Sequence, residues 1–498
     1  MSPDSVGLTC QPPELMDTSG CTQGGYPTYT VDVSNVFQIQ MAVNFARNTG
    51  IRFVIKNTGH DFLGKSSGAG SLSVWMHGMK DMAYLEEYED PTYSGPAIKA
   101  GAGVQGFELY EFGYEHNSIG LGGLCVTVGI LGGWFQGGGH SPLSPLFGMG
   151  ADQVLSLEVV TADGRFVTAN RETNPELFWA LCGGGAGTYG VVTSVTVKAY
   201  PNVPATAATW TFSTDDVTPD QFKESVRSWL SYFPRYADMG LYSYLNVVPT
   251  PSGGNAFIMN PLIAPNKTLS QTQAIIQPWL DEMTALNVTV TPDWTYHSEW
   301  YAVTQTALTN GSANNYGGIT GNRLFPRSNF EDPSSFTATF DAIWSAIEAG
   351  NVMLPYNIAP GYAPGSTSDN AVNPAWREAI AYIIVGGSVD PSLPPAERMA
   401  AHLNFTHGPM QALRDVSPGA GSYGNEGDKL EPNFQWAYYG SFYPRLLELK
   451  KRLDPWNLFY AATAVGAEFL EVRGSEGTVD ENGRLCVNVE PVLFVAEG

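Results

Sequence analysis

The chain has 498 residues, of which 43% are hydrophobic and 12% aromatic, and it carries a formal net charge of −23. This length exceeds what a single hydrophobic core usually serves, so it predicts two domains. The acidic balance disfavours nucleic acids and anionic membrane surfaces as partners. No stretch approaches the roughly 18 consecutive apolar residues of a membrane span.

The first part of the chain, residues 1–202, alternates short strands with helices. An irregular arm (1–28) precedes a strand at 30–33, a helix at 36–48 that Ser34 would cap, and a strand at 51–55. Further along, an Asp-Gly turn at Asp163-Gly164 predicts a hairpin. The remaining elements expected here are strands at 71–75, 97–100, 154–161, 165–169 and 191–198 and a helix at 105–116.

Glycine-rich stretches interrupt these strands. Eight glycines lie between Gly122 and Gly139, and a second glycine-rich turn spans 183–189. Glycine at this density lets backbone N–H groups approach a ligand closely. The pattern favours a large, polyanionic cofactor lying across a sheet, and the alternative is a set of tight turns without a ligand.

An upstream turn adds side-chain donors. Asn57, Thr58, Lys65 and Ser66 follow the strand at 51–55 and suit phosphate oxygens. The spacing is neither that of G-x-G-x-x-G nor that of a Walker motif. No metal-ligand spacing such as C-x-x-C or H-E-x-x-H is present, so we expect no metal site.

The middle of the chain, residues 203–415, is richer in aromatic residues, Thr and Pro. Strands such as 208–212 and 243–248, with helices at 219–233, 270–285 and 336–349, predict a domain of antiparallel sheet and helices that covers the cofactor. The aromatic stretch from Trp294 to Tyr301 is interpreted either as a substrate-stacking surface or as core. Residues 416–498, with a basic amphipathic helix at 442–453, are expected to return to the first domain.

Four sequons, at Asn266, Asn287, Asn310 and Asn404, favour secretion. The opening residues lack the charged and apolar regions of a signal peptide, and we expect an N-terminus that is shortened or processed. Cys10 and Cys21 flank a Pro-rich loop and are candidates for a disulfide. The pairing of Cys182 and Cys486 stays open, and an odd cysteine count leaves one thiol for another use.

Four long motifs carry a family resemblance. They are "NTGHDFLGKSSG", "GGLCVTVG…GGWFQGGGHS", "LCGGGAGTYGVVTSVTVKAYP" and "GSYGNEGDKLEPNFQWAYYGSFYPRLLELKKRLDPWNLFYA". They resemble the berberine-bridge-enzyme-like branch of the vanillyl-alcohol-oxidase/p-cresol-methylhydroxylase flavoproteins, most of all its fungal carbohydrate-oxidase-like members. The resemblance implies an α+β, two-domain fold: an FAD-binding domain (1–202 and 416–498) and an antiparallel-sheet substrate-binding domain (203–415).

The resemblance also implies how FAD is held. His60 matches the histidine joined to the flavin 8α-carbon, and Cys125 matches the cysteine joined to C6 in members with two covalent bonds. The residues alone, without the resemblance, favour a hydrogen-bonded turn residue for His60 and a small buried hydrophobe for Cys125. The other residues expected at the FAD site are Asn57, Thr58, Gly59, Asp61, Gly64, Lys65, Ser66, Gly129, Gly133, Gly137, Gly138, Gly139, His140, Gly190, Val192 and Tyr460.

The stretch Tyr423 to Asp428 resembles the family's Y-x-N-x-x-D segment over the flavin. Tyr423 is predicted to be the general base, oriented by Asn425 and Asp428, with Asp428 and Glu426 as the next candidates. Tyr423 is alternatively a packing residue. Val128, three residues after Cys125, matches a position beside flavin C4a where valine accompanies oxidase behaviour; alternatively, it is a buried strand-end residue.

The resemblance implies an FAD-dependent oxidase acting on a small molecule and O2, and we expect it to be secreted and monomeric. The leading reaction is oxidation of an alcohol or hemiacetal, chiefly the anomeric hydroxyl of a carbohydrate. A hydride would pass to flavin N5 while a base takes the hydroxyl proton, and O2 would be reduced to H2O2. One alternative is oxidation of a secondary metabolite (an alcohol, an amine or a C–C bond-forming site). Another is a flavin-holding protein without turnover.

Overall fold

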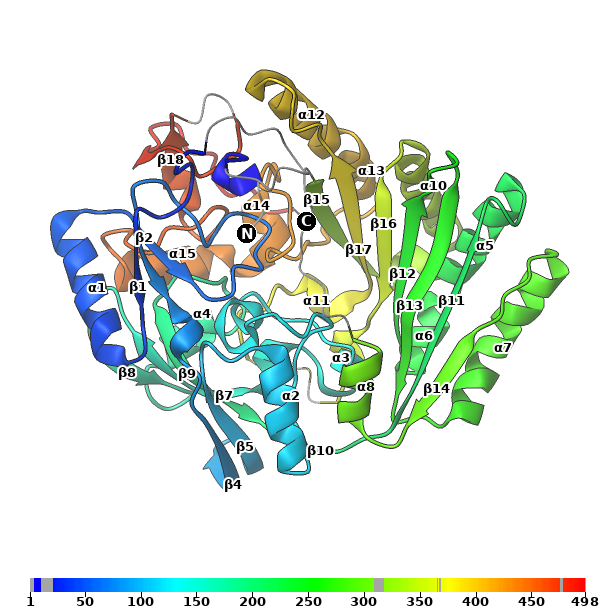
Figure 1. Cartoon of the computed structure of the whole chain (residues 1–498), viewed down its shortest axis with the longest axis horizontal. Coiled ribbons are helices and arrows are strands. Elements are labelled where there is room, and N and C mark those ends of the chain that lie inside the picture. Colours follow the sequence, from blue (N-terminus) through cyan, green and yellow to red (C-terminus); the bar gives the residue numbers. More distant parts are fainter. Residues whose placement is uncertain are drawn as a thin grey trace.

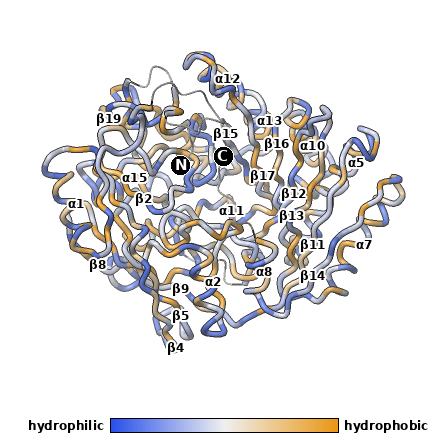
Figure 2. The backbone as a smooth tube through the Cα atoms, in the orientation of Figure 1, coloured by the Kyte–Doolittle hydropathy of each residue, from blue (hydrophilic) through white to orange (hydrophobic). Residues whose placement is uncertain are grey.

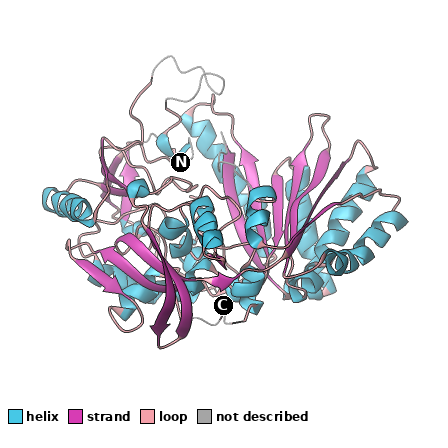
Figure 3. Ribbon diagram, turned by 60° about the horizontal axis from the view of Figure 1, so that its bottom comes forward, coloured by secondary structure: helices cyan, strands magenta, loops and turns pink. Residues whose placement is uncertain are grey.

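The computed structural model describes residues 4–9, 21–308, 318–364, 366, 369–474 and 478–497. Two halves stand side by side, each built on its own antiparallel sheet (Figures 1 and 3). Apolar residues recur along the strands of both sheets (Figure 2), and each sheet contributes to its own hydrophobic core. This is the α+β, two-domain architecture expected from the sequence.

The first half combines two sheets. A five-stranded antiparallel sheet has the order β4-β5-β9-β7-β8, and a three-stranded parallel sheet has the order β1-β3-β2. The hairpin β7–β8 turns at Asp163-Gly164, where Gly164 has a φ of +81°, as predicted. The strands are β1 (Tyr29–Asp32), β2 (Phe53–Lys56), β3 (Leu72–Trp75), β4 (Met82–Asp90), β5 (Tyr93–Gly101), β7 (Val154–Val160), β8 (Phe166–Ala169) and β9 (Val191–Lys198).

Helix α1 (Val36–Thr49) packs its buried side chains, among them Ile39 and Val43, against this half. The helix is capped by Asn35, whose side chain accepts the N–H of Gln38 at 3.1 Å. The expectation that Ser34 caps it is therefore wrong by one residue. The other helices and short elements here are α2 (Gly106–Glu115), β6 (Ser118–Ile119), the π-helical turn η3 (Ile130–Trp134), α3 (Ser144–Phe147), α4 (Pro175–Leu181) and β10 (Tyr200–Pro201).

The second half is a seven-stranded sheet with the order β14-β11-β13-β12-β16-β17-β15 and antiparallel pairing throughout. Helices α5, α6, α7 and α10 cover its outer face (Figure 1). Its strands are β11 (Ala205–Ser213), β12 (Tyr242–Pro249), β13 (Asn255–Pro265), β14 (Asp293–His297), β15 (Gly318–Pro326), β16 (Val352–Asn357) and β17 (Ala379–Ser388). Its helices are α5 (Pro219–Ser231), α6 (Phe233–Asp238), α7 (Leu269–Ala285), α8 (Trp300–Thr306), α9 (Ser328–Glu331), α10 (Pro333–Glu348), α11 (Ala375–Glu378), α12 (Pro395–His407) and α13 (Pro409–Asp415).

The inner face of this sheet looks toward the first half. Because side chains alternate along a strand, Met353 and Ile383 pack under the outer helices while Tyr356, Tyr382 and Ile384 join the core of the first half. The sheet therefore presents a row of side chains to the space between the two halves.

After α13 the chain returns to the first half through α14 (Phe434–Tyr439), α15 (Tyr443–Leu453), β18 (Leu470–Arg473) and β19 (Arg484–Val487). The buried Lys450 of α15 fixes this return. Its Nζ donates to the carbonyls of Thr188 (2.9 Å) and Phe459 (2.7 Å) and to the Asp454 carboxylate (2.7 Å). A buried cation with three acceptors holds three segments in one place.

Several sequence expectations concern surface features. Cys21 is disulfide-bonded, Cys10 lies outside the described residues, and Cys182 is buried. The sequon residues Asn266, Asn287 and Asn404 are exposed, and Asn310 lies outside the described residues. Within the described ranges, no helix is long and apolar enough to cross a bilayer, and no three metal-binding side chains come together.

Candidate functional site

A cavity of about 390 Å³ lies between the two halves, with walls from both. The predicted residues that line it are Asn57, Thr58, Gly59, His60, Asp61, Lys65, Ser66, Cys125, Val128, Gly129, Gly133, His140, Gly190, Val192, Tyr423, Asn425 and Tyr460. The structure thus brings together positions that lie up to about 400 residues apart in the chain, as cofactor sites between domains commonly do.

His60 and Cys125 meet at this cavity through a residue that the sequence analysis did not single out. The Thr127 hydroxyl lies 2.9 Å from His60 Nε2 and 3.4 Å from Cys125 Sγ. Residues 125–128 form a turn, in which the Val128 N–H donates to the Cys125 carbonyl at 3.2 Å, and this turn brings the Thr127 hydroxyl back to the Cys125 sulfur. Burial lowers the pKa of His60, so its imidazole is neutral at pH 7.

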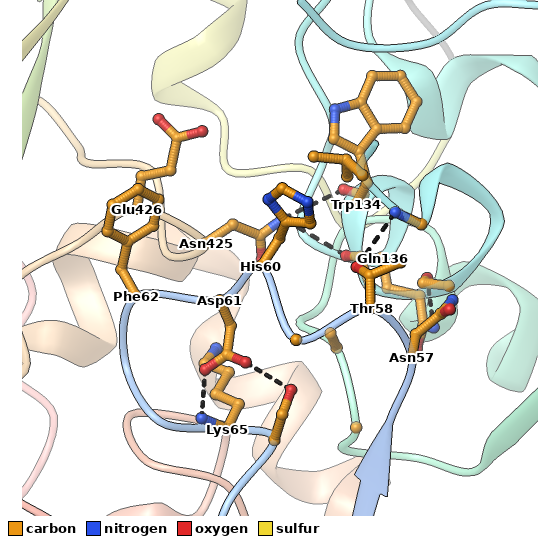
Figure 4. A pocket seen from close by; sticks show the side chains of 18 of the residues that line it. Asn57, Thr58, His60, Asp61, Phe62, Lys65, Trp134, Gln136, Asn425 and Glu426 are labelled. Atoms are coloured by element: carbon orange, nitrogen blue, oxygen red, sulfur yellow. Dashed lines mark hydrogen bonds between the residues drawn. The ribbon is translucent and has the colours of Figure 1, made fainter. Parts of the chain in front are cut away.

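The turn from residue 57 to residue 66 is organised by Asp61. Its carboxylate accepts the backbone N–H of Lys65 at 2.6 Å and the hydroxyl of Ser66 at 2.5 Å (Figure 4). The Lys65 side chain is half-buried at the cavity wall, and its desolvation there lowers its pKa to about 8, partly opposed by Asp61. The turn therefore presents one partly desolvated cation to the cavity.

Three buried polar atoms on the cavity wall have no hydrogen-bond partner among the described residues. They are Asn57 Oδ1, Gln136 Oε1 and His140 Nδ1. Buried polar atoms are rarely left unpaired, because the desolvation cost is not recovered. The cavity also has an open stretch of backbone at Gly187, where an added Cβ would meet nothing within 4 Å. Polar atoms and open backbone of this kind fit a large, polar cofactor such as the expected FAD.

The Tyr423 stretch reaches the same cavity, with a different arrangement from the one predicted. Asn425 Nδ2 donates to the Tyr423 hydroxyl at 2.8 Å. The nearly inaccessible Tyr423, 1% exposed, has its pKa raised by burial and by the Glu426 carboxylate. A raised pKa keeps the phenol protonated, which weakens the prediction that Tyr423 is the base.

Glu426 extends its carboxylate to the cavity wall. Its Oε2 accepts the Tyr382 hydroxyl at 2.6 Å, and its Oε1 lies 3.7 Å from His140 Nε2. His140 is enclosed by aromatic rings: Tyr356, Trp376, Tyr382 and Tyr423. Glu426 is therefore a carboxylate held in place beside an aromatic enclosure.

Asp428 does not orient Tyr423. Its carboxylate accepts the Thr406 hydroxyl at 2.5 Å and lies 2.8 Å from His402 Nε2, both on α12. The residue is 1% exposed and is not among the cavity-lining residues. Asp428 instead fixes the far end of the 423–428 stretch to the second half, because two helix side chains bind it there.

Four of the predicted glycines also lie away from the cavity wall. Gly64 has a φ of +78° and packs against Ser5, which a Cβ would approach to 2.8 Å. Gly137 faces the Asn425 side chain, Gly138 faces Met149, and Gly139, with a φ of +71°, faces the Trp134 ring. These glycines permit close packing behind the wall, while Gly129 and Gly133 lie at the cavity.

The opposite wall comes from the second half, and its individual residues were not predicted. Tyr244 on β12 and Tyr356 on β16 are cross-strand partners whose rings stack at 4.4 Å, and Tyr382 on β17, the next cross-strand partner, lies behind them. Leu354 and Ile384 extend this aromatic wall. The stretch Trp294–Tyr301 does not reach the cavity: Tyr301 stacks on Tyr114 at 4.5 Å instead. The substrate-stacking interpretation of that stretch is wrong.

Two families match the chain. Residues 27–170 match the FAD binding domain family, and residues 422–466 match the berberine and berberine-like family. Among curated proteins, FAD-linked oxidoreductase ZEB1 of Gibberella zeae is 35% identical over 498 residues, covering 98% of this chain and 83% of that protein. VAO-type flavoprotein oxidase VAO615 of Thermothelomyces thermophilus is 36% identical over 472 residues, covering 94% and 79%.

Solved structures agree. The VAO-type flavoprotein MtVAO615 from Myceliophthora thermophila C1 superposes with a TM-score of 0.84 at 34% identity, covering 94% of this chain and 83% of that one. A glucooligosaccharide oxidase from Acremonium strictum, with a 6-S-cysteinyl, 8α-N1-histidyl FAD, shares the fold with a TM-score of 0.68 at 19% identity, covering 89% and 92%. This chain belongs to the VAO-type, berberine-bridge-enzyme-like family of FAD-linked oxidoreductases and is an FAD-dependent enzyme.

Proposed function

We propose that this enzyme is an alcohol oxidase whose FAD is joined covalently to both His60 and Cys125. The observation that carries the attachment is the Thr127 hydroxyl, which contacts the His60 ring at 2.9 Å and the Cys125 sulfur at 3.4 Å. Two nucleophiles this close can reach neighbouring atoms on one edge of a flavin ring. The glucooligosaccharide oxidase of Acremonium strictum, with the same two kinds of attachment on the same fold, supports the assignment.

The chemistry around His60 and Cys125 suits both proposed bonds to the flavin. Burial keeps His60 neutral, and only a neutral imidazole offers a ring nitrogen lone pair as a nucleophile. The Thr127 hydroxyl is able to orient the imidazole and to hydrogen-bond the sulfur. Asn57, Gln136 and Lys65 would hold polar parts of FAD, because each brings a polar or cationic group to the cavity.

When bound, FAD supplies the acceptor for the substrate's hydride. Glu426 takes the hydroxyl proton of the substrate, since its carboxylate lines the cavity and Tyr382 and His140 hold it there. Tyr423 accepts a hydrogen bond from Asn425, which leaves its own proton available to bind the substrate oxygen. Asp428 has no part in this set, because its carboxylate is bound by α12.

The aromatic wall indicates the substrate class. Tyr244 and Tyr356 present stacked rings, with Leu354 and Ile384 beside them. These flat and aliphatic surfaces favour an alcohol with an apolar ring, as in an aryl alcohol or a secondary metabolite. Carbohydrates are the second candidate, because aromatic faces also stack on the apolar faces of sugars and a chitooligosaccharide oxidase shares the fold at 17% identity.

The test is anaerobic mixing of the flavin-loaded enzyme with panels of aryl alcohols and oligosaccharides. We expect the visible flavin absorbance to bleach with aryl alcohols, and readmitted air to restore it with release of H2O2. Bleaching by sugars alone would replace the aryl-alcohol assignment. No bleaching with any compound of the panels would favour a flavin-holding protein without turnover.

The proposal includes secretion. Asn266, Asn287 and Asn404 are exposed, so each of these sequons is open to glycosylation. Expression in a eukaryotic secretory host should give a protein whose mass falls on enzymatic removal of N-glycans. An unchanged mass would contradict the glycosylation that supports secretion.

A further inference from the structure

A second, smaller cavity of about 70 Å³ lies where α12, the 423–429 stretch and the N-terminal segment meet. Figure 1 shows α12 (olive) beside β15 and β17 at this edge of the molecule. The volume is room for a few water molecules or for one small polar group. The alcohol oxidation proposed above does not use this cavity.

Its lining is basic in a protein of strongly acidic composition. Arg398, His402 and Lys429 line it, and no Asp or Glu does so among the described residues. Two of these three side chains already have an acidic partner: Asp428 lies 2.8 Å from His402 Nε2, and Glu481 pairs with Lys429 as well as with Arg52. Asp480 accepts from the Thr478 hydroxyl.

Among the described residues, Arg398 is the cation of this cavity that makes no ion pair, and its buried Nε has no hydrogen-bond partner. The residue as a whole is half-buried. A guanidinium whose Nε–H is buried and unpaired has a strong affinity for a carboxylate, which accepts two parallel hydrogen bonds from it.

The small cavity borders the main one. Phe62 and Thr320 line both. Glu426 lines the main cavity and the next residue, Gly427, lines the small one, so the main chain passes between them in a single step of about 3.8 Å. A molecule lying against Glu426 is therefore within a few atoms of the basic cavity.

We propose that the small cavity is an anion subsite in which Arg398 binds a carboxylate carried by the substrate. This inference rests on the proposed alcohol oxidation and narrows its substrate to acids: the oxidised carbon lies at Glu426 while the carboxylate lies past Phe62 and Thr320. An acidic protein needs such a local cation to accept an anionic substrate, because its overall charge repels one.

Binding is tested first, without turnover. The thermal unfolding midpoint of the flavin-loaded enzyme is measured against sodium acetate and against acetamide, its neutral analogue, at pH 7 and constant ionic strength. We expect a saturable rise with acetate alone. Arg398→Gln should weaken acetate binding by at least about tenfold. Arg398→Lys keeps the charge but loses the bidentate guanidinium geometry, and it should weaken acetate binding less.

Arg235→Gln is the matched control, because Arg235 is exposed on α6 and the change removes the same charge. It should leave the acetate titration unchanged. Equal responses to acetate and acetamide, or an acetate response that survives in Arg398→Gln, would overturn the subsite.

Kinetics then test the link to the main cavity. The ratio of kcat/KM for 4-(hydroxymethyl)benzoate to that for its methyl ester should fall about tenfold in Arg398→Gln and stay unchanged in Arg235→Gln. An unchanged ratio in Arg398→Gln would refute the substrate carboxylate. If both alcohols are inert, the proposed alcohol oxidation fails for this class, and the acetate titration still decides whether Arg398 binds an anion.

Discussion

The two walls of the main cavity are built in different ways. The wall from the first half consists of turns, such as 57–66, whose side chains bond to neighbours a few residues away, as Asp61 does with Lys65 and Ser66. The wall from the second half consists of side chains on strands, and Tyr244 and Tyr356 meet only because β12 and β16 pair in one register. We infer that the first wall holds the cofactor and the second selects the substrate.

The largest effect should come from the attachment residues of the first wall. Acid precipitation of the unmodified protein should leave its flavin with the polypeptide. His60→Ala and Cys125→Ala should each leave one bond and retain flavin, and the double variant should release all of it. Absorbance of the supernatant and pellet measures this directly.

Tyr244→Phe, on the second wall, is the control and should retain all flavin. Flavin appearing entirely in the supernatant of the unmodified protein would show that no covalent bond forms.

The second largest effect should come from removing Glu426, the proposed base, which lies between the two walls. Glu426→Gln should slow anaerobic flavin reduction by about 10²–10⁴-fold, because a positioned general base contributes that much. Tyr423→Phe should slow it only about tenfold, the worth of one hydrogen bond to the substrate oxygen. Stopped-flow absorbance gives both rates, and a larger loss in Tyr423→Phe than in Glu426→Gln would return the base to Tyr423.

The difference between the walls also explains what the sequence could predict. His60, Asp61 and Lys65 lie in one contiguous turn, so a motif of a dozen residues identifies them together. Tyr356 and Ile384 become wall residues only through strand order and register, which local patterns do not encode. The prediction that Asp428 orients Tyr423 was wrong because it was drawn from the neighbours Asn425 and Glu426, which do face the cavity. The contacts that turn Asp428 toward α12 come from His402 and Thr406, which are distant in the sequence.

The roles of the glycines likewise could not be predicted from the sequence. Gly129 and Gly139 look alike in the sequence, and at each of them an added Cβ would come within 2.7 Å of a neighbouring side chain. Gly129 faces Asn57 at the cavity, whereas Gly139 faces Trp134 behind the wall, and only the tertiary structure separates these roles.

A smaller effect is expected at Lys65. Burial lowers its pKa from 10.5 to about 8, so the flavin-free site carries this cation below pH 8 and loses it as pH rises above that value. In the double attachment variant, FAD affinity should therefore fall by up to about tenfold between pH 7 and pH 9, because the diphosphate loses a counter-charge. Fluorescence titration of FAD measures the dissociation constant.

Lys65→Gln should bind FAD with the weaker, high-pH affinity throughout that interval. A Lys65→Gln variant that keeps the full pH dependence would assign the titration to another group.

The smallest effect should be a change in oxygen access at Val128, a half-buried residue on the cavity wall. Val128→Leu adds one methylene in closely packed surroundings and should slow reoxidation of the reduced enzyme several-fold. Val192→Leu is the matched control, since Val192 is another valine of the same wall. Equal reoxidation rates in Val128→Leu and the unmodified enzyme would remove Val128 from the path of O2.

The return of the C-terminal segment to the first half has a consequence for biosynthesis. Lys450 ties Thr188 to Phe459, and Phe459, Tyr460 and Ala461 complete a cavity whose first residues are Phe53 and Ile55. At roughly 5–20 residues per second, a ribosome needs about 20–80 s to travel from the first cavity residues to the last. The entire second half is synthesised in that interval. A nascent chain that stalls after the His60 and Cys125 codons still lacks the second wall and the closing residues 459–461, so we expect stable FAD binding only once nearly the whole chain has emerged.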